Sequence, residues 1–595
     1  MKKIFFALFV VLCSLVADAQ QDSSTNITVV FDGDRRLFLR DATRLNVWPQ
    51  TKDSIVEMTK IKYTTLPTPK AITIEPKLIP AAKINVEEKL PYLYKGYLKA
   101  GYGTYNTIPI DFYFSDGRSK KGTYGVHYQF LRGDGVSLND EDSIPDRYSD
   151  NKAEIWGKWF IKKYQLLGKF NWDRNVSHWY GYNIKTEDDG PVFDSLQFDQ
   201  RMNTFGGGLS FFTYERDTGD FNFRGDISLR NTTDIRNNKE TNFDILLHGR
   251  SLVDSTLYSM DVGVNWNGFK FFGPDISGKI ENRLDTNVYD FQLPDKVYQN
   301  RNFDNAIIKF VPTASTTWRN LRAKIGAGLY IDARGSQSAH FYPLAELSYN
   351  LFHGIVVPYA GIRGNLEPTT YYGLYQLNPF VQPFPDLRNR NNKLDAYAGI
   401  GGAVSSTVSY AAGVNYFKWD DFAYFINDSL SSPADGYYTW GNQFTVVYDE
   451  LSAINFHGEL AYYAGEKWKG NIRVDYFNYT TVDTDHPWHQ PALKLLANGQ
   501  YNLKNKFIIS TDLFYNGARW AKSLVPVEGV TQAANGSYEY KLKGFLDANF
   551  RVEYRYNKRL SAWLQLNNAF ALKYQRWGAY NNQQLVAMLG ASYSF

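Results

Sequence analysis

Histidines are the residues most able to do chemistry in this chain of 595 residues, which contains eight of them. His486 and His489, in the sequence HPWH, have a spacing that two metal ligands could use. A zinc site needs three or four protein ligands, and neither cysteine nor a cluster of carboxylates stands beside this pair, so we expect no metal there. His127, His248 and His457 each lie among polar residues at alternating positions, which favours polar filler inside a β-structure over catalysis.

An acidic stretch from Asp140 to Asp142, followed by Asp146 and Asp150, has the oxygen ligands that Ca²⁺ prefers. It lacks the glycine-centred spacing of a dedicated calcium loop, so we expect a solvated loop. No glycine-rich phosphate loop stands between a strand and a helix, and no Ser-His-Asp arrangement can be assigned. We therefore predict no cofactor, no metal and no enzymatic activity.

The N-terminus has the pattern of a secretory signal peptide. Two lysines precede an apolar run, and the small-residue motif A-D-A ends at Ala19, so we predict cleavage between Ala19 and Gln20. Cleavage would remove Cys13, which is the only cysteine, and with it any disulfide or thiolate chemistry. Leu12, just before it, is not the small residue that a lipoprotein signal needs.

Composition points to strands as the only way of crossing a membrane. The chain has 44 Tyr, 40 Phe and 14 Trp, yet its mean hydropathy of -0.41 is that of a polar protein. Beyond the signal peptide no stretch approaches 18 consecutive apolar residues. Many aromatic residues without long apolar runs are typical of strands that alternate between lipid and a polar lumen. The net charge of +4 is too even to favour nucleic acid as a partner.

Alternation is clearest from Ser537 to Asn557, where apolar residues occupy every second position and charged residues many of the others. Successive side chains of a strand point to opposite faces, so one face would meet lipid and the other the lumen of a barrel. The charges that we assign to the lumen are Lys541, Lys543, Asp547, Arg551, Glu553 and Arg555. Their mixed signs indicate ion pairs between strands rather than a selective ring of one sign.

The chain ends on another alternating segment, with Tyr593 and Phe595 on the predicted lipid-facing row. A terminal phenylalanine in this position resembles the assembly signal of outer-membrane barrels, and we predict that role for both residues. Counting alternating segments back to about residue 92 gives 22 strands, provided that Gln443 to Tyr463 is one strand, as its continuous parity favours. An even count places both ends of the barrel on the periplasmic side. Pro312, inside one segment, predicts a β-bulge.

Residues 20–91 differ in composition from the alternating segments that follow, because five prolines between positions 67 and 91 break an otherwise extended segment. Barrels of 22 strands normally carry a plug in the lumen. A plug would need on the order of 150 residues, whereas only about 70 precede the barrel. The expected organisation is a signal peptide over 1–19, a periplasmic extended segment over 20–91 and the barrel over 92–595.

Three stretches resemble the Bacteroidetes-type outer-membrane barrels that are described as TonB-dependent-receptor-like. They are Tyr94 to Pro109 (YKGYLKAGYGTYNTIP), Asn442 to Gly470 (NQFTVVYDELSAINFHGELAYYAGEKWKG) and Pro491 to Lys522. The resemblance covers most of residues 92–595 and implies an all-β, transmembrane antiparallel β-barrel in the cell outer membrane. The chain departs from TonB-dependent transporters in lacking a recognisable plug domain and energy-coupling box, which puts active uptake in doubt.

Two classes of function remain open. A transport or pore protein, plugless or gated by a partner, fits 22 strands around a polar lumen. A structural or interaction component of an outer-membrane assembly or secretion complex fits the missing plug and the segment 20–91, and a barrel enzyme is the least favoured alternative. The expected partners are outer-membrane lipid and periplasmic or outer-membrane proteins. Candidates for covering the lumen are the mixed charges, the loops Pro274 to Asp304 and Thr370 to Asn392, and the segment 20–91.

Overall fold

The computed structural model describes residues 94–595 apart from several gaps. The gaps are residues 118, 120, 136–145, 182–198, 214–220, 272–300, 335–337, 429–430, 433–436, 439–440 and 528. The predicted cleavage site at Ala19 and Gln20 and the segment 20–91 lie outside the described residues and stay predictions. The acidic stretch 140–142 and most of the loop 274–304 lie outside them as well.

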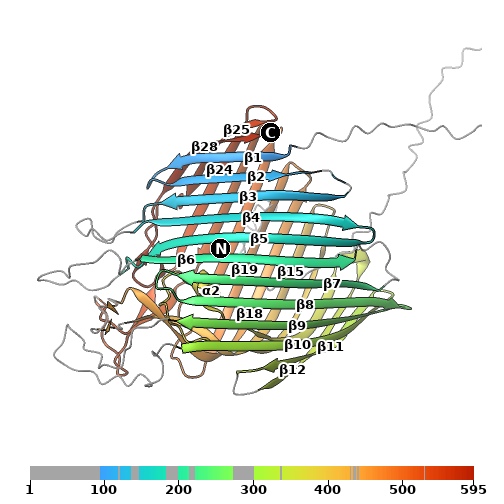
Figure 1. Cartoon of the computed structure of the whole chain (residues 1–595), viewed down its shortest axis with the longest axis horizontal. Coiled ribbons are helices and arrows are strands. Elements are labelled where there is room, and N and C mark those ends of the chain that lie inside the picture. The colour runs from blue at the N-terminus through green and yellow to red at the C-terminus, as the bar shows by residue number, and fades with distance from the viewer. Residues whose placement is uncertain are drawn as a thin grey trace, which may run out of the picture. The chain divides into compact units, whose positions relative to one another are not determined.

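The described residues form a closed antiparallel β-barrel of 22 strands, as predicted (Figure 1). Two barrel strands are each interrupted, so that β21 continues into β22 and β23 into β24. The strands are β1 (Gly96–Gly103), β2 (Ile108–Ser115), β3 (Gly122–Gly133), β4 (Tyr148–Ile161), β5 (Tyr164–His178), β6 (Asp199–Thr213), β7 (Asn222–Asp234), β8 (Lys239–Val253), β9 (Thr256–Phe271), β10 (Arg301–Trp318), β11 (Leu321–Asp332), β12 (Ala339–Tyr349), β13 (Val357–Glu367), β14 (Arg390–Ala403), β15 (Val408–Asp428), β18 (Gln443–Ala464), β19 (Trp468–Thr481), β20 (Leu493–Leu503), β21 (Phe507–Asn516), β22 (Arg519–Ser523), β23 (Tyr538–Leu542), β24 (Phe545–Arg555), β25 (Leu560–Asn567) and β28 (Val586–Ser594).

Smaller elements lie in the connections. The short hairpins are β16 (Ser431–Ser432) with β17 (Tyr437–Tyr438) and β26 (Gln575–Trp577) with β27 (Tyr580–Asn581). A 3-10 helix, η2 (Phe352–Gly354), lies in a turn, and α2 (Tyr371–Leu377) lies between β13 and β14. Among the described residues, no helix is long and apolar enough to cross a membrane.

Side-chain exposure follows the predicted alternation. On β24, Leu546 is 40% exposed and its neighbour Asp547 only 1%, and on β28 Leu589 is 65% exposed and Met588 only 5%. Large apolar side chains are exposed on barrel strands all around the sheet, as at Trp318 and Phe341. Leaving them in water would forfeit about 1.5–3 kcal/mol per side chain, whereas contact with lipid removes that cost. This outer surface is therefore the face that meets the membrane.

The sheet closes where the last strand meets the first. β1 pairs with both β2 and β28, and Phe595 completes the seam by donating its N–H to Gly96 O and accepting at its own carbonyl from Lys95 N–H. The ring of Phe595 stacks on Phe112 and Phe114 at centroid distances of 6.4 and 6.5 Å. The chain end thus fastens β28 to β1 and β2, and the predicted assembly role of Tyr593 and Phe595 stays a prediction.

Most connections at one end of the barrel are short, and the long loops lie at the other end. The turns at 162–163, 254–255 and 319–320 lie at one end with the start of β1 and the end of β28, whereas the loops 368–389 and 568–585 lie at the other. By the usual rule for these barrels the long-loop end is extracellular. The segment from Gln443 to Ala464 is one strand, β18, as predicted.

Two local expectations are corrected. Pro312 pairs with Met260 of β9 and causes no bulge, because the pairing of β10 with β11 keeps one register on both sides of it. Only Val311 and Pro312 are left out of that second ladder, so the missing N–H interrupts it without adding a residue. The segment from Ser537 to Asn557 is interrupted at Lys543 and Gly544, where β23 ends and β24 begins.

Candidate functional site

The six charged residues predicted for the lumen lie in different surroundings along β23 and β24. Arg551 Nη2 is 3.1 Å and Arg555 Nε 3.6 Å from the Glu553 carboxylate, so these three form one row. Asp547, near the extracellular end, is buried and accepts a hydrogen bond from the Tyr574 hydroxyl at 2.8 Å. The two lysines, Lys541 and Lys543, are both exposed, and Lys543 lies in the break between the strands. Their role in the lumen stays a prediction.

Charges on the inner face of the wall are joined across neighbouring strands or along one strand. His127 Nε2 lies 2.9 Å from Asp111 Oδ1 of β2, and His248 contacts Asp261 of β9. Arg473 binds Asp475 through two hydrogen bonds of 2.7 and 3.0 Å on β19. Further pairs join Lys324 to Glu346 and Arg363 to Asp395. The inner wall therefore has mixed and mostly paired charge, which suits a water-filled interior better than a selective ring of one sign.

A loop folds over the extracellular end of the barrel, and we name residues 368–389 the cap loop. Its centre is α2, which begins after Thr370, whose extended backbone and side-chain oxygen cap the first turn by accepting from Gly373 N–H at 3.0 Å. The helix ends at Leu377, because Pro379 disfavours helical backbone in the residue before it, and Asn378 is accordingly extended.

A buried carboxylate on β8 holds the start of α2. Glu240, 1% exposed, accepts from the backbone N–H of Tyr371 at 2.6 Å and of Tyr372 at 2.9 Å, one on each oxygen. A helix N-terminus carries unpaired N–H groups and a positive partial charge, so a carboxylate there is favourable. Asn267 steadies Glu240 with a hydrogen bond of 3.1 Å, and the Tyr371 hydroxyl donates to Asp234 at 3.1 Å.

The second half of the cap loop joins other parts of the rim. Gln382 N–H donates to Phe444 O at 2.9 Å, and Phe444 N–H donates to Phe380 O at 3.0 Å, which adds a short parallel bridge to β18. Phe380 stacks on Tyr580 of β27 with ring centroids 3.6 Å apart. On the far wall, Asn238 donates to Pro383 O at 2.9 Å.

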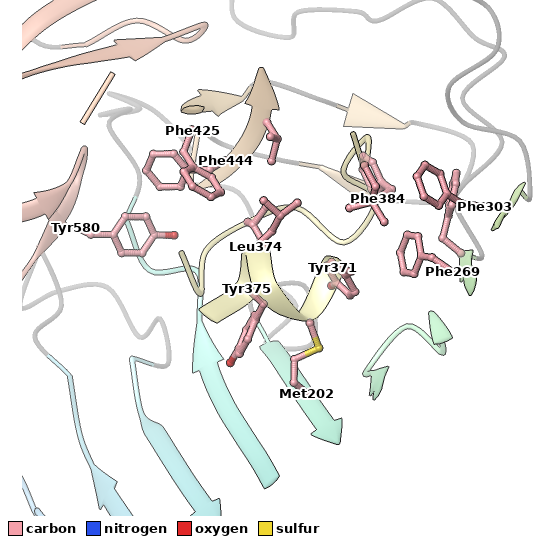
Figure 2. Packing of buried hydrophobic residues seen from close by; sticks show 14 residues of the cluster. Met202, Phe269, Phe303, Tyr371, Leu374, Tyr375, Phe384, Phe425, Phe444 and Tyr580 are labelled. Atoms are coloured by element: carbon pink, nitrogen blue, oxygen red, sulfur yellow. The ribbon is translucent and has the colours of Figure 1, made fainter. Parts of the chain in front are cut away.

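These contacts extend the cap loop across the mouth of the barrel. The loop leaves the wall between β13 and β14. Its anchors on β7 and β8 lie five or six strand positions away in one direction, and its anchor on the β25–β28 connection lies seven or eight strand positions away in the other. A segment held at three places about a third of the circumference apart must span the opening. Figure 2 shows α2 at the centre, with Met202 on one side and Phe425, Phe444 and Tyr580 on another.

An apolar cluster beneath and around α2 stabilises this arrangement. Tyr371, Leu374 and Tyr375 are each at most 3% exposed. Val381, Phe384 and Leu387 of the cap loop belong to the same cluster. Its buried members outside the cap loop come from six other segments and are Met202, Phe269, Phe271, Phe303, Phe425, Phe444, Val446 and Tyr580. Burial of side chains of this size stabilises by about 1.5–3 kcal/mol each, so the cluster is a substantial part of what keeps the mouth covered.

The hairpin of β15 and β18 supports the cap loop beyond the membrane. The end of β15 is buried on both faces, because Phe425 packs in the cluster around α2 whereas Tyr424 and Ile426 pack in a second cluster with Trp488. His489, next to Trp488, has Nδ1 at 3.0 Å from Phe425 O and Nε2 accepting from Gly578 N–H at 3.3 Å. Burial, with the nearby Arg519, lowers the pKa of His489 to about 3, so the ring is neutral.

Sequence reasoning placed Thr370 to Asn392 among the loops that could cover the lumen but did not find α2 or its anchor Glu240. The HPWH pair also proves structural in its contacts: His486 stacks on Trp520 with centroids 4.1 Å apart, and His489 joins the hairpin to β26 and β27. No group of three or more His, Cys, Asp or Glu suited to a metal ion occurs among the described residues. The available signals for α2 were the Thr370 cap and Pro379, which are too short and common to stand out.

No family model and no curated protein matches the chain. Solved structures match it in fold. The FrpB iron transporter from Neisseria meningitidis, F3-3 variant, has a TM-score of 0.61 and 11% identity, covering 85% of this chain and 82% of that chain. The siderophore receptor PirA from Acinetobacter baumannii gives a TM-score of 0.60 and 11% identity over 85% and 81% of the two chains.

A third match is the pyoverdine outer membrane receptor FpvA from Pseudomonas aeruginosa PAO1 bound to pyoverdine, with a TM-score of 0.59, 11% identity and coverage of 85% and 79%. At this identity the likeness concerns the fold. It confirms the predicted barrel fold, which is similar to that of these outer-membrane receptors and transporters. The neighbours are transporters and receptors rather than enzymes. The predicted absence of a plug concerns residues 20–91, outside the described part of the chain.

Proposed function

We propose that this chain is a transport barrel of the outer membrane whose extracellular mouth is gated by the cap loop, and that it works without a plug of its own or under the control of a partner. The observation that carries the proposal is the cap loop held across the mouth by Glu240 and the apolar cluster. A barrel that served only as an anchor would not need a separate closure above a lumen lined with paired charges.

The contacts between the cap loop and the rim suit a loop that opens and closes. The cap loop is joined to the rim by separate polar contacts rather than by a continuous ladder. Its partners are Gln200, Asp234, Asn238, Glu240, Asn305, Asp332, Asp421, Phe444, Thr445 and Tyr448. Each such hydrogen bond contributes about 0.5–1.5 kcal/mol net, or about 1.5–3 kcal/mol where a charge takes part. A solute or a partner could replace these separate contacts and the buried surface of the apolar cluster with contacts of its own, whereas opening a barrel strand would break a whole ladder at once.

The test compares conductance in planar bilayers. Replacing residues 369–388 with a short Gly-Ser linker should raise single-channel conductance and permeability to antibiotics in cells, because the mouth loses its cover. As a matched control, the equally external loop 524–537 is shortened in a second variant and should change conductance less. If the linker variant folds, shown by heat-modifiable mobility, and conducts no more than the unmodified barrel, the gating proposal fails.

The segment 20–91 offers a second point of control. Deleting residues 22–88 while keeping the signal should leave a folded barrel, because the described barrel closes without them. A rise in conductance would assign the segment to covering the periplasmic mouth. Loss of a copurifying protein with unchanged conductance would make it a docking arm, and no change in either property would refute both roles.

A component of an outer-membrane assembly is the second candidate. It is favoured by one of the structural neighbours, the FpvAI–pyocin S2 complex, in which a barrel of this fold is bound to a protein, with a TM-score of 0.57 and 11% identity. Copurification after mild detergent extraction separates the two candidates. Stoichiometric partners that survive washing favour an assembly role, whereas a lone barrel that conducts favours transport.

A further inference from the structure

A hollow lies at the extracellular end of the barrel, away from the cap loop. It has a volume of about 250 Å³ and is lined by the ends of β3, β4, β21, β24, β25 and β28, by Thr107 and by the connection between β25 and β28. None of the cap-loop residues lines it. Ligand pockets usually enclose about 300–1,000 Å³, so this one suits a small molecule or the end unit of a longer one.

A buried carboxylate forms one side of this hollow. Asp547 is 1% exposed, accepts from the Tyr574 hydroxyl at 2.8 Å and from the backbone N–H of Ala548, and has no basic partner among the residues that the structure describes. A carboxylate can accept about four hydrogen bonds, so Asp547 keeps free acceptor capacity toward the hollow. Burying such a group without an ion pair costs stability, and this cost favours a functional explanation.

Two amide side chains face the same space with free donors. Asn549 accepts at its side-chain oxygen from Asn568 N–H at 3.3 Å, and Asn567 accepts from Gln565 at 3.0 Å. Within the described part of the chain, the NH₂ groups of Asn549 and Asn567 have no hydrogen-bond partner. The hollow therefore offers one strong acceptor and two donors within one small volume.

Aromatic rings supply the remaining surface. Tyr574 stacks on Phe545 with centroids 3.9 Å apart, which fixes its ring against the wall, and Phe514 and Tyr148 also line the hollow. The negative face of an aromatic ring attracts C–H groups that carry a partial positive charge. A ligand that presents C–H bonds on one face and hydroxyl groups at its edge would use all these features together.

We infer that this hollow binds a neutral polyhydroxylated ligand, such as one sugar unit at the end of a glycan. Its hydroxyl groups would donate to Asp547 and accept from Asn549 and Asn567, while an apolar face of its ring would lie on an aromatic side chain. An anionic ligand is disfavoured, because Asp547 would repel it and no Lys or Arg lines the hollow. That the barrel takes up this ligand rests on the proposed transport function, whereas binding of the ligand in the hollow does not depend on it.

Isothermal titration of the full folded chain in detergent with glucose, galactose, mannose and N-acetylglucosamine tests the inference. At least one of these probes should bind, and Asp547→Asn should weaken it about tenfold to a hundredfold, as expected for the loss of a charged acceptor. Asp111→Asn is the matched control: Asp111 is a carboxylate of the inner wall that bonds Tyr97 and His127 and does not line the hollow, so affinity should stay unchanged.

Asn567→Ala gives an independent reading in case Asp547→Asn fails to fold, and it should also weaken binding. No binding of any probe at millimolar concentration would overturn the inference. Equal effects of Asp547→Asn and Asp111→Asn would do the same, as would Asp547-dependent binding of tetramethylammonium in place of the sugars. A sugar that binds through Asp547 but does not enter liposomes containing the barrel would contradict the transport function and leave the binding site intact.

Discussion

Glu240→Gln should loosen the cap loop while leaving the barrel in place. Glu240 satisfies two N–H groups at the start of α2, one with each carboxylate oxygen. Glutamine keeps one carbonyl oxygen and turns an NH₂ group toward the other N–H, so one buried donor loses its acceptor. The cost of leaving such a donor unsatisfied is about 1–3 kcal/mol. Because Glu240 is 1% exposed, water cannot replace the lost partner without opening the site.

This cost applies to the closed state alone, since the N–H groups of an open cap loop would bond to water. The population of the open state should therefore rise roughly 5- to 150-fold. A single cysteine at position 381 can report it, because Val381 is fully buried in the closed arrangement and the secreted chain is expected to contain no other thiol. The rate of maleimide labelling of Val381→Cys should rise in proportion to the open population when closing is faster than labelling.

The control is Glu346→Gln, which removes the same charge from an inner-wall carboxylate paired with Lys324 at 3.8 Å and distant from α2. Labelling of Val381→Cys should be unaffected by it. The reasoning would be refuted if Glu240→Gln left the labelling rate within twofold of the parent, or if Glu346→Gln accelerated labelling as much. Unchanged heat-modifiable mobility of each variant shows that the barrel itself stays folded.

Three further outcomes are expected. Leu546→Arg should reduce folded yield more than Asn549→Arg, because a lipid-facing charge costs about 2–4 kcal/mol at the midplane and less near the extracellular interface, whereas a lumen position tolerates it; equal yields would overturn the strand register. Deleting Phe595 should lower the amount of heat-modifiable barrel in the outer membrane, and an unchanged amount would count against an assembly signal in the last strand. Acidification should loosen the hairpin that supports the cap loop, because His489, whose ring packs on Phe444 of that hairpin, has a pKa of about 3 when buried, whereas an exposed histidine has one of about 6.5. A loosened hairpin that exposes His489 binds a proton below about pH 6.5, which weakens its closed arrangement, and with it the contact of Phe444 with the cap loop, by about 2 kcal/mol at pH 5. His489→Gln should remove most of the resulting pH dependence of Val381→Cys labelling, and a pH dependence that persists would exclude His489 as its source.

The barrel was predictable because its signal is local and repeated. Each strand shows the period-2 pattern in its own sequence, as in the alternation of Leu546 with Asp547, and an error in one segment does not spread to the others. Local alternation also predicted that the last strand ends at Phe595 and that one strand continues through Asp449 and Glu450. The bulge predicted at Pro312 was wrong. A strand can accommodate the missing N–H either by a bulge or by leaving two residues unpaired in the same register, and the sequence does not show which of these the neighbouring strand allows.

The cap loop was not predictable in detail, because its stability comes from residues that are distant in the sequence. Glu240 and Tyr371 are 131 positions apart, and the strand that carries Glu240 gives no local sign that its carboxylate will cap a helix. Phe444 has the parity of lipid-facing residues in β18, yet it lies beyond the membrane and is fully buried against the cap loop. Apolar residues near strand ends can thus meet lipid or a loop, and alternation alone does not separate the two.

The cap loop and the hollow beside Asp547 contact the same segment of the chain. The cap loop reaches Tyr580 through Phe380, and the connection between β25 and β28 that carries Tyr580 also carries Tyr574, which bonds Asp547 in the hollow. A ligand that moved Tyr574 would act on the same short segment that supports one anchor of the cap loop. Such coupling requires only that the ligand contact the segment differently in the open and closed states. Measuring Val381→Cys labelling with and without a bound sugar would detect it, and an identical rate would show that the two sites act independently.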